Sequence, residues 1–530
     1  MSSAPRPGNL AIILHAHLPF VRHPEHEWFF EEEWLFEAIT ETYVPLVAMM
    51  RRLHANAVPF RITMSVTPTL CAMLRDELLL ERYVRHLNEL IELSEREIDR
   101  TRDTDLAPLA HFYHELFRET KKLFVDEWQC DVIQQLREVR DLGSLEIIAS
   151  SATHAVLPLL QKTSGAAPAQ VAIGCDEFRE IFSADPVGFW LPECAYAPGI
   201  DVLLQRQEIR WFVIDAHGLT SAQPAAMRGT YAPCFTPAGP AAFARDRETS
   251  RQVWDAKSGF PGDPAYRDFY RDIGFDLTPE MIGKLSHGVR KFTGIKYHRV
   301  TGGDGAKQLY DPAGAKRVAH EHARHFLERR TAQFSELREH NFTPIVVAPF
   351  DAELFGHWWF EGPLFLEQLI RLIAARAEVE LTTPTKYLES NPTQQSTQVA
   401  ASSWGDKGYF DVWLDEKCSW IYPLLHRAGR EMSELTRKHF ADSDPKTSRV
   451  LKQLARELLL AQSSDWPFLI RNHTAGDYAS ARVRDHLECF RRLHDSFVAG
   501  RVDDAFLSGC EARDNLFRDL DWRHYISSCN

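Results

Sequence analysis

Short apolar runs that alternate with helical segments constrain the fold of this 530-residue chain more than any other feature. Leu10–Leu14 is continuously apolar, as is typical of a parallel strand buried on both faces. Trp34–Leu53 then has helical periodicity. Further short runs with the character of strands occur at Phe60–Val66, Leu145–Ile148, Phe189–Leu191, Trp211–Ile214 and Pro344–Val347. This alternation predicts a parallel α/β architecture.

Polar side chains collect directly after the predicted strands. His15 and His17 follow the first strand, and their spacing of two puts both on the same face. His154, Glu193 and Asp351 follow three later strands. Because the carboxyl ends of parallel strands meet at one edge, we expect these side chains at the mouth of a barrel-like sheet.

Two regions depart from the alternation. Leu78–Asp103 and Leu106–Arg140 are charged and amphipathic, and they predict a helical insertion near residues 70–140. Residues 224–305 lose all periodicity and are rich in Pro, Gly and aromatic residues. A segment of that length in an enzyme predicts a lid or a small inserted subdomain.

The last quarter of the chain has a different pattern. Asn391–Ala401 is polar and has no periodicity, so we place a domain boundary there. Four amphipathic segments follow at Leu424–Phe440, Thr447–Ala461, Ala479–Ala499 and Val502–Asp519. We therefore expect a catalytic domain over residues 1–395 and an α-helical domain over residues 396–530.

Charge and cysteine content exclude several classes of protein. With 61 basic and 74 acidic residues the net charge is −13, which disfavours a nucleic-acid or anionic-membrane partner. No run is long and apolar enough for a transmembrane helix, and His15 and His17 interrupt the only apolar stretch near the N-terminus. Nine cysteines without a CxxC pair predict free thiols. We expect a cytoplasmic monomer.

Two carboxylic acids suggest the chemistry. Glu193 lies in FWLPECAY (Phe189–Tyr196) and Asp351 in APFDAELFGHWWFEGP (Ala348–Pro363). Two carboxylates at strand ends, each among aromatic residues, suit hydrolysis or transfer at a sugar acetal. Glu353, as a nearby like charge, would raise the pKa of Asp351, which suits an acid/base. The alternative is that both acids are solvated loop residues.

The histidines leave three interpretations open. His15, His17 and His154 could recognise sugar hydroxyls, could be hydrogen-bonded core residues, or could join an acid in a zinc site. No phosphate-binding loop, dinucleotide fingerprint or serine nucleophile elbow is present, so nucleotide-dependent and serine-hydrolase functions are disfavoured.

Tryptophans accompany the acids. Indole rings stack on the apolar faces of sugars, so some of these residues should line a glucan site, although each one alone could be core packing. The candidates are Trp28, Trp190, Trp358, Trp404 and Trp413. Trp404 and Trp413 are the best of them, because Gly405 and Gly408 indicate an exposed turn beside them.

Five segments together resemble the motif regions of glycoside hydrolase family 57. They are HAHLP (His15–Pro19), Ala152–Leu160, WLPECAY (Trp190–Tyr196), Phe350–Pro363 and SSWGDKGYFDVWL (Ser402–Leu414). Within that family the chain is most similar to the 1,4-α-glucan branching enzymes. The similarity extends over nearly the whole chain, including GFPGDPAYRDFYRDIGFD (Gly259–Asp276) and SSDWPF (Ser463–Phe468).

The resemblance implies a fold and a mechanism. It implies a (β/α)7 barrel with a helical insertion and a helical C-terminal domain. It implies Glu193 as nucleophile and Asp351 as general acid/base in a retaining reaction without metal or other cofactor. It also implies that Arg267, Trp404 and Asp465 contact an α-1,4-glucan such as amylose or glycogen, to which the enzyme adds α-1,6 branches.

One departure from the family pattern keeps rival functions open. Branching members carry a tyrosine on a mobile loop, and the matching region here, Tyr231–Phe243, offers Tyr231 without a clear match. The nearest alternative is an α-amylase or 4-α-glucanotransferase. More distant ones are a metal-dependent polysaccharide deacetylase that uses His15, His17 and an acid, and a catalytically silent glucan-binding protein.

Overall fold

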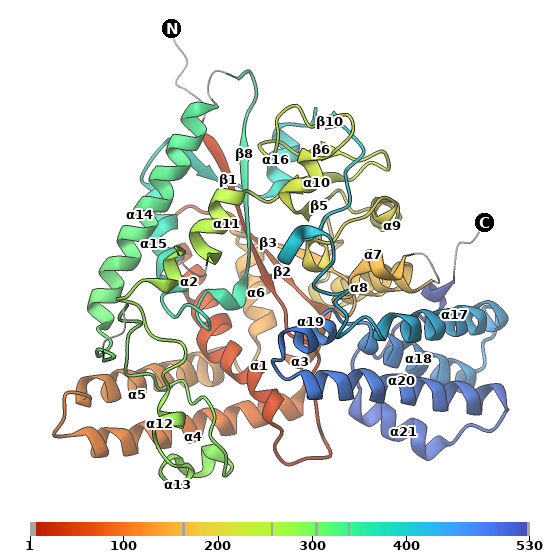
Figure 1. The fold of residues 1–530 in the computed structure, drawn as a ribbon, viewed down its shortest axis with the longest axis horizontal. Helices are drawn as coiled ribbons and strands as arrows, with labels where there is room; N and C mark the ends of the chain where they lie inside the picture. The colour runs from red at the N-terminus through yellow and green to blue at the C-terminus, as the bar shows by residue number, and fades with distance from the viewer. Residues whose placement is uncertain (1–6, 162–164, 256–257, 303–305, 338–339, 527–530) are drawn as a thin grey trace.

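Parallel strands form the centre of this computed structural model, which describes residues 7–161, 165–255, 258–302, 306–337 and 340–526 (Figure 1). Within these residues seven strands follow the order β7-β5-β4-β3-β2-β1-β8, and neighbouring strands are parallel. They are β1 (Gly8–Ala16), β2 (Ile62–Val66), β3 (Leu145–Ser150), β4 (Gly188–Trp190), β5 (Trp211–Ile214), β7 (Ala241–Ala244) and β8 (Ile345–Asp351).

The register brings the strand ends together. His15 on β1 lies opposite Asp351 on β8 and opposite Ser65 on β2. Where the sheet approaches closure, the backbone N–H of Asp246, just beyond β7, donates to Val347 O on β8 over 2.8 Å. The predicted parallel α/β barrel is confirmed, and continuous apolar runs such as Leu10–Leu14 are fully buried as expected.

Three short strands extend the sheet. β6 (Cys234–Phe235) is antiparallel to β7, β10 (Gln395–Ser396) pairs with β6, and β9 (Val379–Leu381) pairs with β1. β10 lies within residues 391–401, so part of the segment predicted as a domain boundary pairs along the sheet edge. The boundary itself stays a prediction.

Helices connect the strands. The helix predicted at Trp34–Leu53 is continuous, but a π-helical turn, η2 (Ile39–Tyr43), separates α1 (Glu33–Ala38) from α2 (Val44–Ala55). A π-turn changes which side chains face inward, and here it buries Glu41 and Tyr43. The other connecting helices are α3 (Pro68–Met73), α7 (Leu157–Leu160), α8 (Ala166–Phe182), α9 (Ile200–Gln205), α10 (Ala216–Thr220), α14 (Pro312–Glu336), α15 (Gly362–Ala374) and α16 (Pro384–Ser390).

The helical insertion consists of α4 (Glu77–Thr101) and α5 (Ala107–Lys121), followed by α6 (Val132–Asp141). Asp76 caps α4 by accepting a hydrogen bond from the Leu79 N–H over 3.1 Å. The single helix predicted over 106–140 is wrong. The observed helix α5 ends in a π-turn, η3 (Lys122–Glu127). Gln129 and Cys130 then adopt left-handed backbone conformations, which interrupt the helix before α6 begins.

The segment predicted as a lid or a small inserted subdomain over 224–305 is in part a component of the barrel. Its first part contains β7, a strand of the central sheet, followed by α11 (Arg247–Trp254). Its later part contains the short helices α12 (Ile273–Asp276) and α13 (Pro279–Ile282). This part contacts α1 through the ion pair Lys291–Glu33 and η2 through the ion pair Arg267–Glu41. It contacts α5 through the hydrogen bond that Tyr113 Oη donates to Lys296 O. Residues 256–257 and 303–305 lie outside the described residues.

The predicted helical C-terminal region is confirmed. It comprises α17 (Ile421–His439), α18 (Pro445–Ala461), α19 (Asp465–Asn472), α20 (Gly476–Val498) and α21 (Asp504–Arg513). In Figure 1 these helices lie at the lower right and α4 and α5 at the lower left, and Asn515 Nδ2, just after α21, donates to Asp76 at the start of α4 over 2.9 Å. The short helix α19 was not predicted, and it begins where Ser464 N donates to His154 O over 3.0 Å. The C-terminal helices thus contact the barrel just after β3. None of the helices in the described ranges is both long and apolar enough to cross a membrane.

Candidate active site

Glu193 lies in the turn that follows β4, in a left-handed backbone conformation with φ 63°. Such a conformation costs a non-glycine residue about 1–3 kcal/mol and is concentrated at functional sites. The Glu193 carboxylate accepts a hydrogen bond from Trp404 Nε1 at Oε2 and another from Ser464 Oγ at Oε1, each over 2.7 Å. Burial raises the pKa of Glu193, but these two hydrogen bonds favour its anion.

Asp351 is the last residue of β8 and has a contrasting environment. Burial raises its pKa well above the usual range, the charges of Glu353 and Glu193 raise it further, and Arg245 opposes them. The described residues give the Asp351 carboxyl no hydrogen bond that would stabilise its anion. The pKa of both carboxyls is therefore raised, but among the described residues only Glu193 has hydrogen bonds that oppose the shift, so Asp351 is the group more strongly biased toward the protonated form.

A histidine stack connects the two carboxyls. The ring of His15, beside Asp351 in the sheet register, lies 4.4 Å from the Trp190 ring and 4.8 Å from the His154 ring. His154 Nδ1 lies 3.8 Å from Glu193 Oε1. Burial lowers the pKa of both His15 and His154 well below the usual value, so both imidazoles are neutral.

The hydrogen bonds assign the imidazole protons. Ser464 Oγ donates to Glu193, so His154 Nδ1, which is 2.8 Å from Ser464 Oγ, must be the donor in that pair. His154 Nε2 is then an acceptor, and His15 Nε2 donates to it over 2.9 Å. The proton positions thus propagate from the Glu193 carboxylate to His15.

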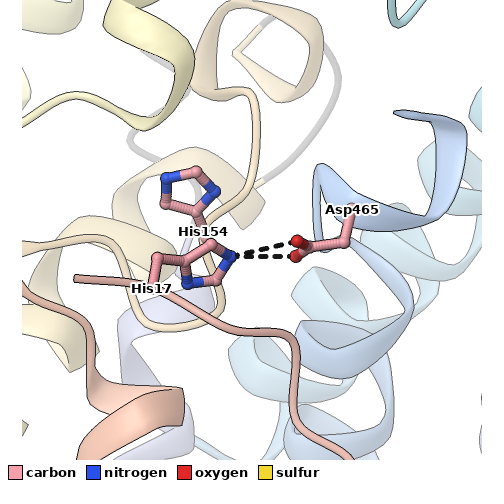
Figure 2. A group of neighbouring side chains, drawn as sticks. All are labelled: His17, His154 and Asp465. Carbon is pink, nitrogen blue, oxygen red and sulfur yellow. Dashed lines mark hydrogen bonds and ion pairs between the residues drawn. The ribbon is translucent and has the colours of Figure 1, made fainter. Parts of the chain in front are cut away.

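His17 forms an ion pair with Asp465 (Figure 2). Its Nε2 lies 3.0 Å from Asp465 Oδ2, and its Nδ1 lies 3.0 Å from Thr67 Oγ1. Burial lowers the pKa of His17, but Asp465 reverses this and the net pKa is raised. Burial likewise raises the pKa of Asp465, and His17 brings it below its usual value. Asp465 begins α19, so the C-terminal helices supply this charge.

The three residues drawn in Figure 2 are candidate metal ligands. Ligand atoms of His17, His154 and Asp465 all lie within 4.8 Å of one another. His154 replaces His15 in the set that the HxH pattern suggested. However, both ring nitrogens of His17 and of His154 already have hydrogen-bonding partners within 3.2 Å, so a cation would have to displace several of them.

We therefore expect chelation to leave the enzyme active. Dialysis against EDTA should change the rate on an α-glucan by less than about twofold, because the hydrogen bonds alone orient both imidazoles. Rates before dialysis, after it and after addition of zinc measure this. A loss of activity that zinc restores would favour the metal-dependent alternative.

The predicted aromatic residues divide into two groups. Trp404 is half-buried, bonds Glu193 and meets the Trp190 ring edge-to-face at 5.2 Å. Trp190 and Trp413 are 0% and 1% exposed, so the prediction that their faces stack on sugar needs correction. Trp413 packs with Val156 and Ala195 beneath Trp404 and supports it.

Three predicted glucan-binding residues contact side chains other than the two carboxyls. The Arg267 side chain is 1% exposed, bonds Glu41 Oε1 over 2.7 Å and covers the Phe360 ring. Its contact with glucan stays a prediction. Trp28 donates to Glu33 and stacks on His287. Trp358 is 52% exposed and stacks on Phe269 at the surface.

Tyr231 does not reach this site. Its carbonyl accepts a hydrogen bond from Ile345 N at the amino end of β8, and its hydroxyl accepts one from Gln333 Nε2 over 3.1 Å. Asp351 lies at the opposite end of the same strand. Tyr231, the tyrosine that this region offers, therefore lies away from the end of β8 that carries Asp351.

Several functional residues were not predicted from the sequence. Ser464 is the most important of them, since it bonds both Glu193 and His154. Arg245 follows β7 and forms an ion pair with Asp215 at the end of β5. Tyr43 Oη donates to Glu353 over 2.6 Å. Of these residues, only Asp215 directly follows a strand that the sequence predicts, Trp211–Ile214, so its position at the strand end could have identified it.

Replacement of Ser464 by alanine should reduce kcat/KM about 10- to 100-fold, because a hydrogen bond to a charged group contributes about 1.5–3 kcal/mol. Loss of the donor should also raise the Glu193 pKa and move the acid limb of the pH profile upward. Initial rates on amylose across pH measure both effects. Ser335→Ala, on the exposed face of α14, is the matched control. Equal kinetics for both variants would contradict the assigned role.

Comparisons with known proteins agree with this geometry. Residues 11–400 match the family model described as glycosyl hydrolase family 57, and residues 424–525 match that of the 1,4-alpha-glucan branching enzyme C-terminal region. The chain is similar to the alpha-amylase AmyC from Thermotoga maritima, with 40% identity, TM-score 0.92, and coverage of 99% of this chain and 100% of that one. It is also similar to the branching enzyme from Pyrococcus horikoshii, with 33% identity, TM-score 0.89, and coverage of 98% and 97%. A 1,4-alpha-glucan branching enzyme of Thermococcus kodakarensis is 34% identical over 98% of this chain and 79% of its own length.

Proposed function

The chain belongs to glycosyl hydrolase family 57, and we propose that it is a 1,4-alpha-glucan branching enzyme. One observation carries the proposal. Two carboxyls follow β4 and end β8, and the charge of Glu193 raises the pKa of Asp351. Hydrogen bonds that favour the anion are present at Glu193 and, among the described residues, not at Asp351, so Asp351 is the group more strongly biased toward the acid. The branching-enzyme match over residues 424–525 and the similarity to two branching enzymes support the choice of reaction. Cytoplasmic location and a monomeric state stay predictions.

The proposed reaction is a double displacement. Glu193 attacks the anomeric carbon of an α-1,4-linked glucose unit while Asp351 protonates the departing glycosidic oxygen. A covalent glucosyl-enzyme forms with inversion. Asp351, now a carboxylate, takes the proton from the 6-hydroxyl of an acceptor glucan, which attacks the same carbon and releases Glu193. The second inversion restores the α configuration and creates an α-1,6 branch.

The surrounding residues suit this sequence of events. Trp404 and Ser464 hold the Glu193 carboxylate while leaving Asp351 unbonded, so the two groups enter the first step in opposite protonation states. The neutral rings of His15 and His154 add no positive charge that would stabilise the Asp351 anion prematurely.

Hydrolysis is the second candidate outcome. The Thermotoga maritima relative is described as an alpha-amylase, and Tyr231 lies at the far end of β8. If water replaces the acceptor hydroxyl in the second step, the same carboxyl pair releases a reducing end without forming a branch.

Incubation with amylose separates these outcomes. Proton NMR counts new α-1,6 linkages, and a reducing-end assay counts hydrolytic events. A branching enzyme should form more α-1,6 linkages than reducing ends. Reducing ends alone would assign the chain as an amylase, and redistribution of α-1,4 chain lengths without either product would assign a 4-α-glucanotransferase.

Replacement of Arg245 by glutamine should extend activity to higher pH. The Arg245 charge lowers the Asp351 pKa, so its removal lets Asp351 remain protonated at higher pH and moves the alkaline limb of kcat/KM upward. The acid limb, set by Glu193, should move much less. Profiles of kcat/KM against pH measure the shift, and Arg210→Gln, at an exposed position before β5, is the control. A downward shift of the alkaline limb would contradict this assignment.

A further inference from the structure

A second group of reactive side chains lies inside the C-terminal helices, apart from the carboxyl pair. Cys489 on α20, Cys510 on α21 and Glu457 on α18 place their two Sγ atoms and a carboxylate oxygen within 4.8 Å of one another. The two cysteines are 7% and 2% exposed. Neither is bonded to the other in this structure, and both are free thiols.

The positively charged side chain of Arg513 lies within this group. The Arg513 guanidinium nitrogen Nη2 lies 3.3 Å from Cys489 Sγ, 3.7 Å from Glu457 Oε1 and 2.7 Å from Asp514 Oδ2. Glu457 also accepts a hydrogen bond from Gln453 Nε2 over 2.8 Å, and its Oε2 lies 2.7 Å from His486 Nδ1 in a second hydrogen bond. A metal ion here would meet the arginine charge and a carboxylate that is already bonded, so the arrangement favours thiol chemistry over metal binding.

The two thiols are not equivalent. A hydrogen bond from Cys510 lowers the pKa of Cys489, and Arg513 acts in the same direction against the effect of burial. The same hydrogen bond, together with burial, raises the pKa of Cys510. A neighbouring cation and one depressed thiol are the features that make one member of a cysteine pair the nucleophile.

The cover over the pair is thin. Of the ten residues of α21, Leu507 and Cys510 are the buried ones. A short helix with so little buried surface belongs to the segments that open locally without global unfolding. Opening of α21 would expose both thiols to a small reagent.

We propose that Cys489 and Cys510 form a redox-active pair that closes to a disulfide between α20 and α21. The oxidant is a low-molecular-weight disulfide. The Cys489 thiolate attacks one of its sulfurs and releases the first small thiolate, which leaves a mixed disulfide on Cys489. Cys510 then loses its proton and attacks the Cys489 sulfur, which releases the second thiolate. The protein loses two protons and two electrons, and the small disulfide becomes two thiols.

Oxidation of the folded full-length protein with oxidised glutathione tests this. After acid quenching, alkylation with iodoacetamide and digestion without reduction, mass spectrometry should find a peptide pair linked through Cys489 and Cys510. Two of the nine thiols should be lost to alkylation, and dithiothreitol should restore both. Glutathione adducts confined to the partly exposed Cys130, with Cys489 and Cys510 fully alkylated, would overturn the proposal.

Variants assign the two roles. Cys510→Ser should accumulate a stable glutathione adduct on Cys489, because the resolving thiol is missing. Cys489→Ser should leave Cys510 unmodified, and Cys418→Ser, which removes a buried cysteine elsewhere, should form the crosslink as the parent does. Elemental analysis of the untreated protein completes the test. One equivalent of zinc that protects both thiols from oxidation would overturn the disulfide assignment in favour of a metal site.

Discussion

Replacement of Glu193 by glutamine is expected to reduce cleavage of α-1,4-glucan by about 10⁴-fold or more, because it removes the group that forms the covalent intermediate. Glutamine keeps the size of the side chain: its carbonyl oxygen can accept the hydrogen bond from Trp404, and its amide NH2 can donate to Ser464 Oγ. The fold should therefore persist while the chemistry stops.

Initial rates on amylose, with reducing ends and α-1,6 linkages counted separately, measure the effect of Glu193→Gln. Thermal unfolding and glucan affinity should stay close to those of the parent. Glu380→Gln, at the exposed central position of β9, is the matched control and should have parental rates. If Glu193→Gln retained more than about one hundredth of the parental rate, another group would have to be the nucleophile.

The stereochemistry of rescue sharpens this test. Glu193→Ala leaves room for a small anion, and azide should restore turnover of an activated α-glucosyl donor such as the fluoride. Because azide would attack from the face that Glu193 occupied, the product should be the β-glucosyl azide. An α-glucosyl azide would contradict a retaining mechanism with Glu193 as nucleophile.

The second large effect is expected for Asp351→Asn, which should lower the rate on amylose by about 10²- to 10⁴-fold through loss of general acid and base catalysis. The alkaline limb of the pH profile should disappear with it, because the raised pKa of Asp351 sets that limb.

Leaving-group dependence identifies the role of Asp351. A nitrophenyl maltooligosaccharide departs without protonation, so formation of the glucosyl-enzyme, followed as the nitrophenol burst, should be at least about tenfold less impaired than cleavage of amylose. Asp99→Asn, an exposed substitution on α4, controls for loss of charge. Equal impairment on both substrates would exclude Asp351 as the general acid.

The barrel and its strand-end residues could be predicted because they depend on local pattern. Continuous apolar runs such as Leu10–Leu14 fix both the strand and its burial. The parallel arrangement then places the ends of different strands at one edge, so His15, Glu193 and Asp351 could be grouped without coordinates. Burial of the carboxyls and the direction of the Asp351 pKa shift follow from the same placement.

The residues that could not be predicted depend on partners distant in the sequence. Ser464 is 271 residues from Glu193, and no local pattern indicates that its hydroxyl bonds the carboxylate. Trp413 follows a glycine-rich turn that suggests exposure, yet Val156 and Ala195 from other loops cover it. Arg267 lies in an irregular segment, and no local residue pattern indicates the π-turn that directs Glu41 toward it.

The same irregular geometry explains why Tyr231 could not be placed from the sequence. The stretch around Tyr231 lacks periodicity because it contains very short strands and turns, and not because it forms a separate loop outside the barrel. Prolines and glycines in such a stretch indicate turns, and turns occur at both ends of a barrel. Only the hydrogen bond to Ile345 shows which end this one occupies.

The contact between Ser464 and the Glu193 carboxylate has a consequence for how the enzyme is made. A nascent chain whose first 400 residues have emerged from the ribosome already carries both acids. It still lacks the Ser464 hydroxyl that binds Glu193 and the Asp465 carboxylate that binds His17. Such an unfinished polypeptide should hold the nucleophile without its final restraint and remain nearly inert. Competence for glucan remodelling would then arise only once the residues of α19 have been added.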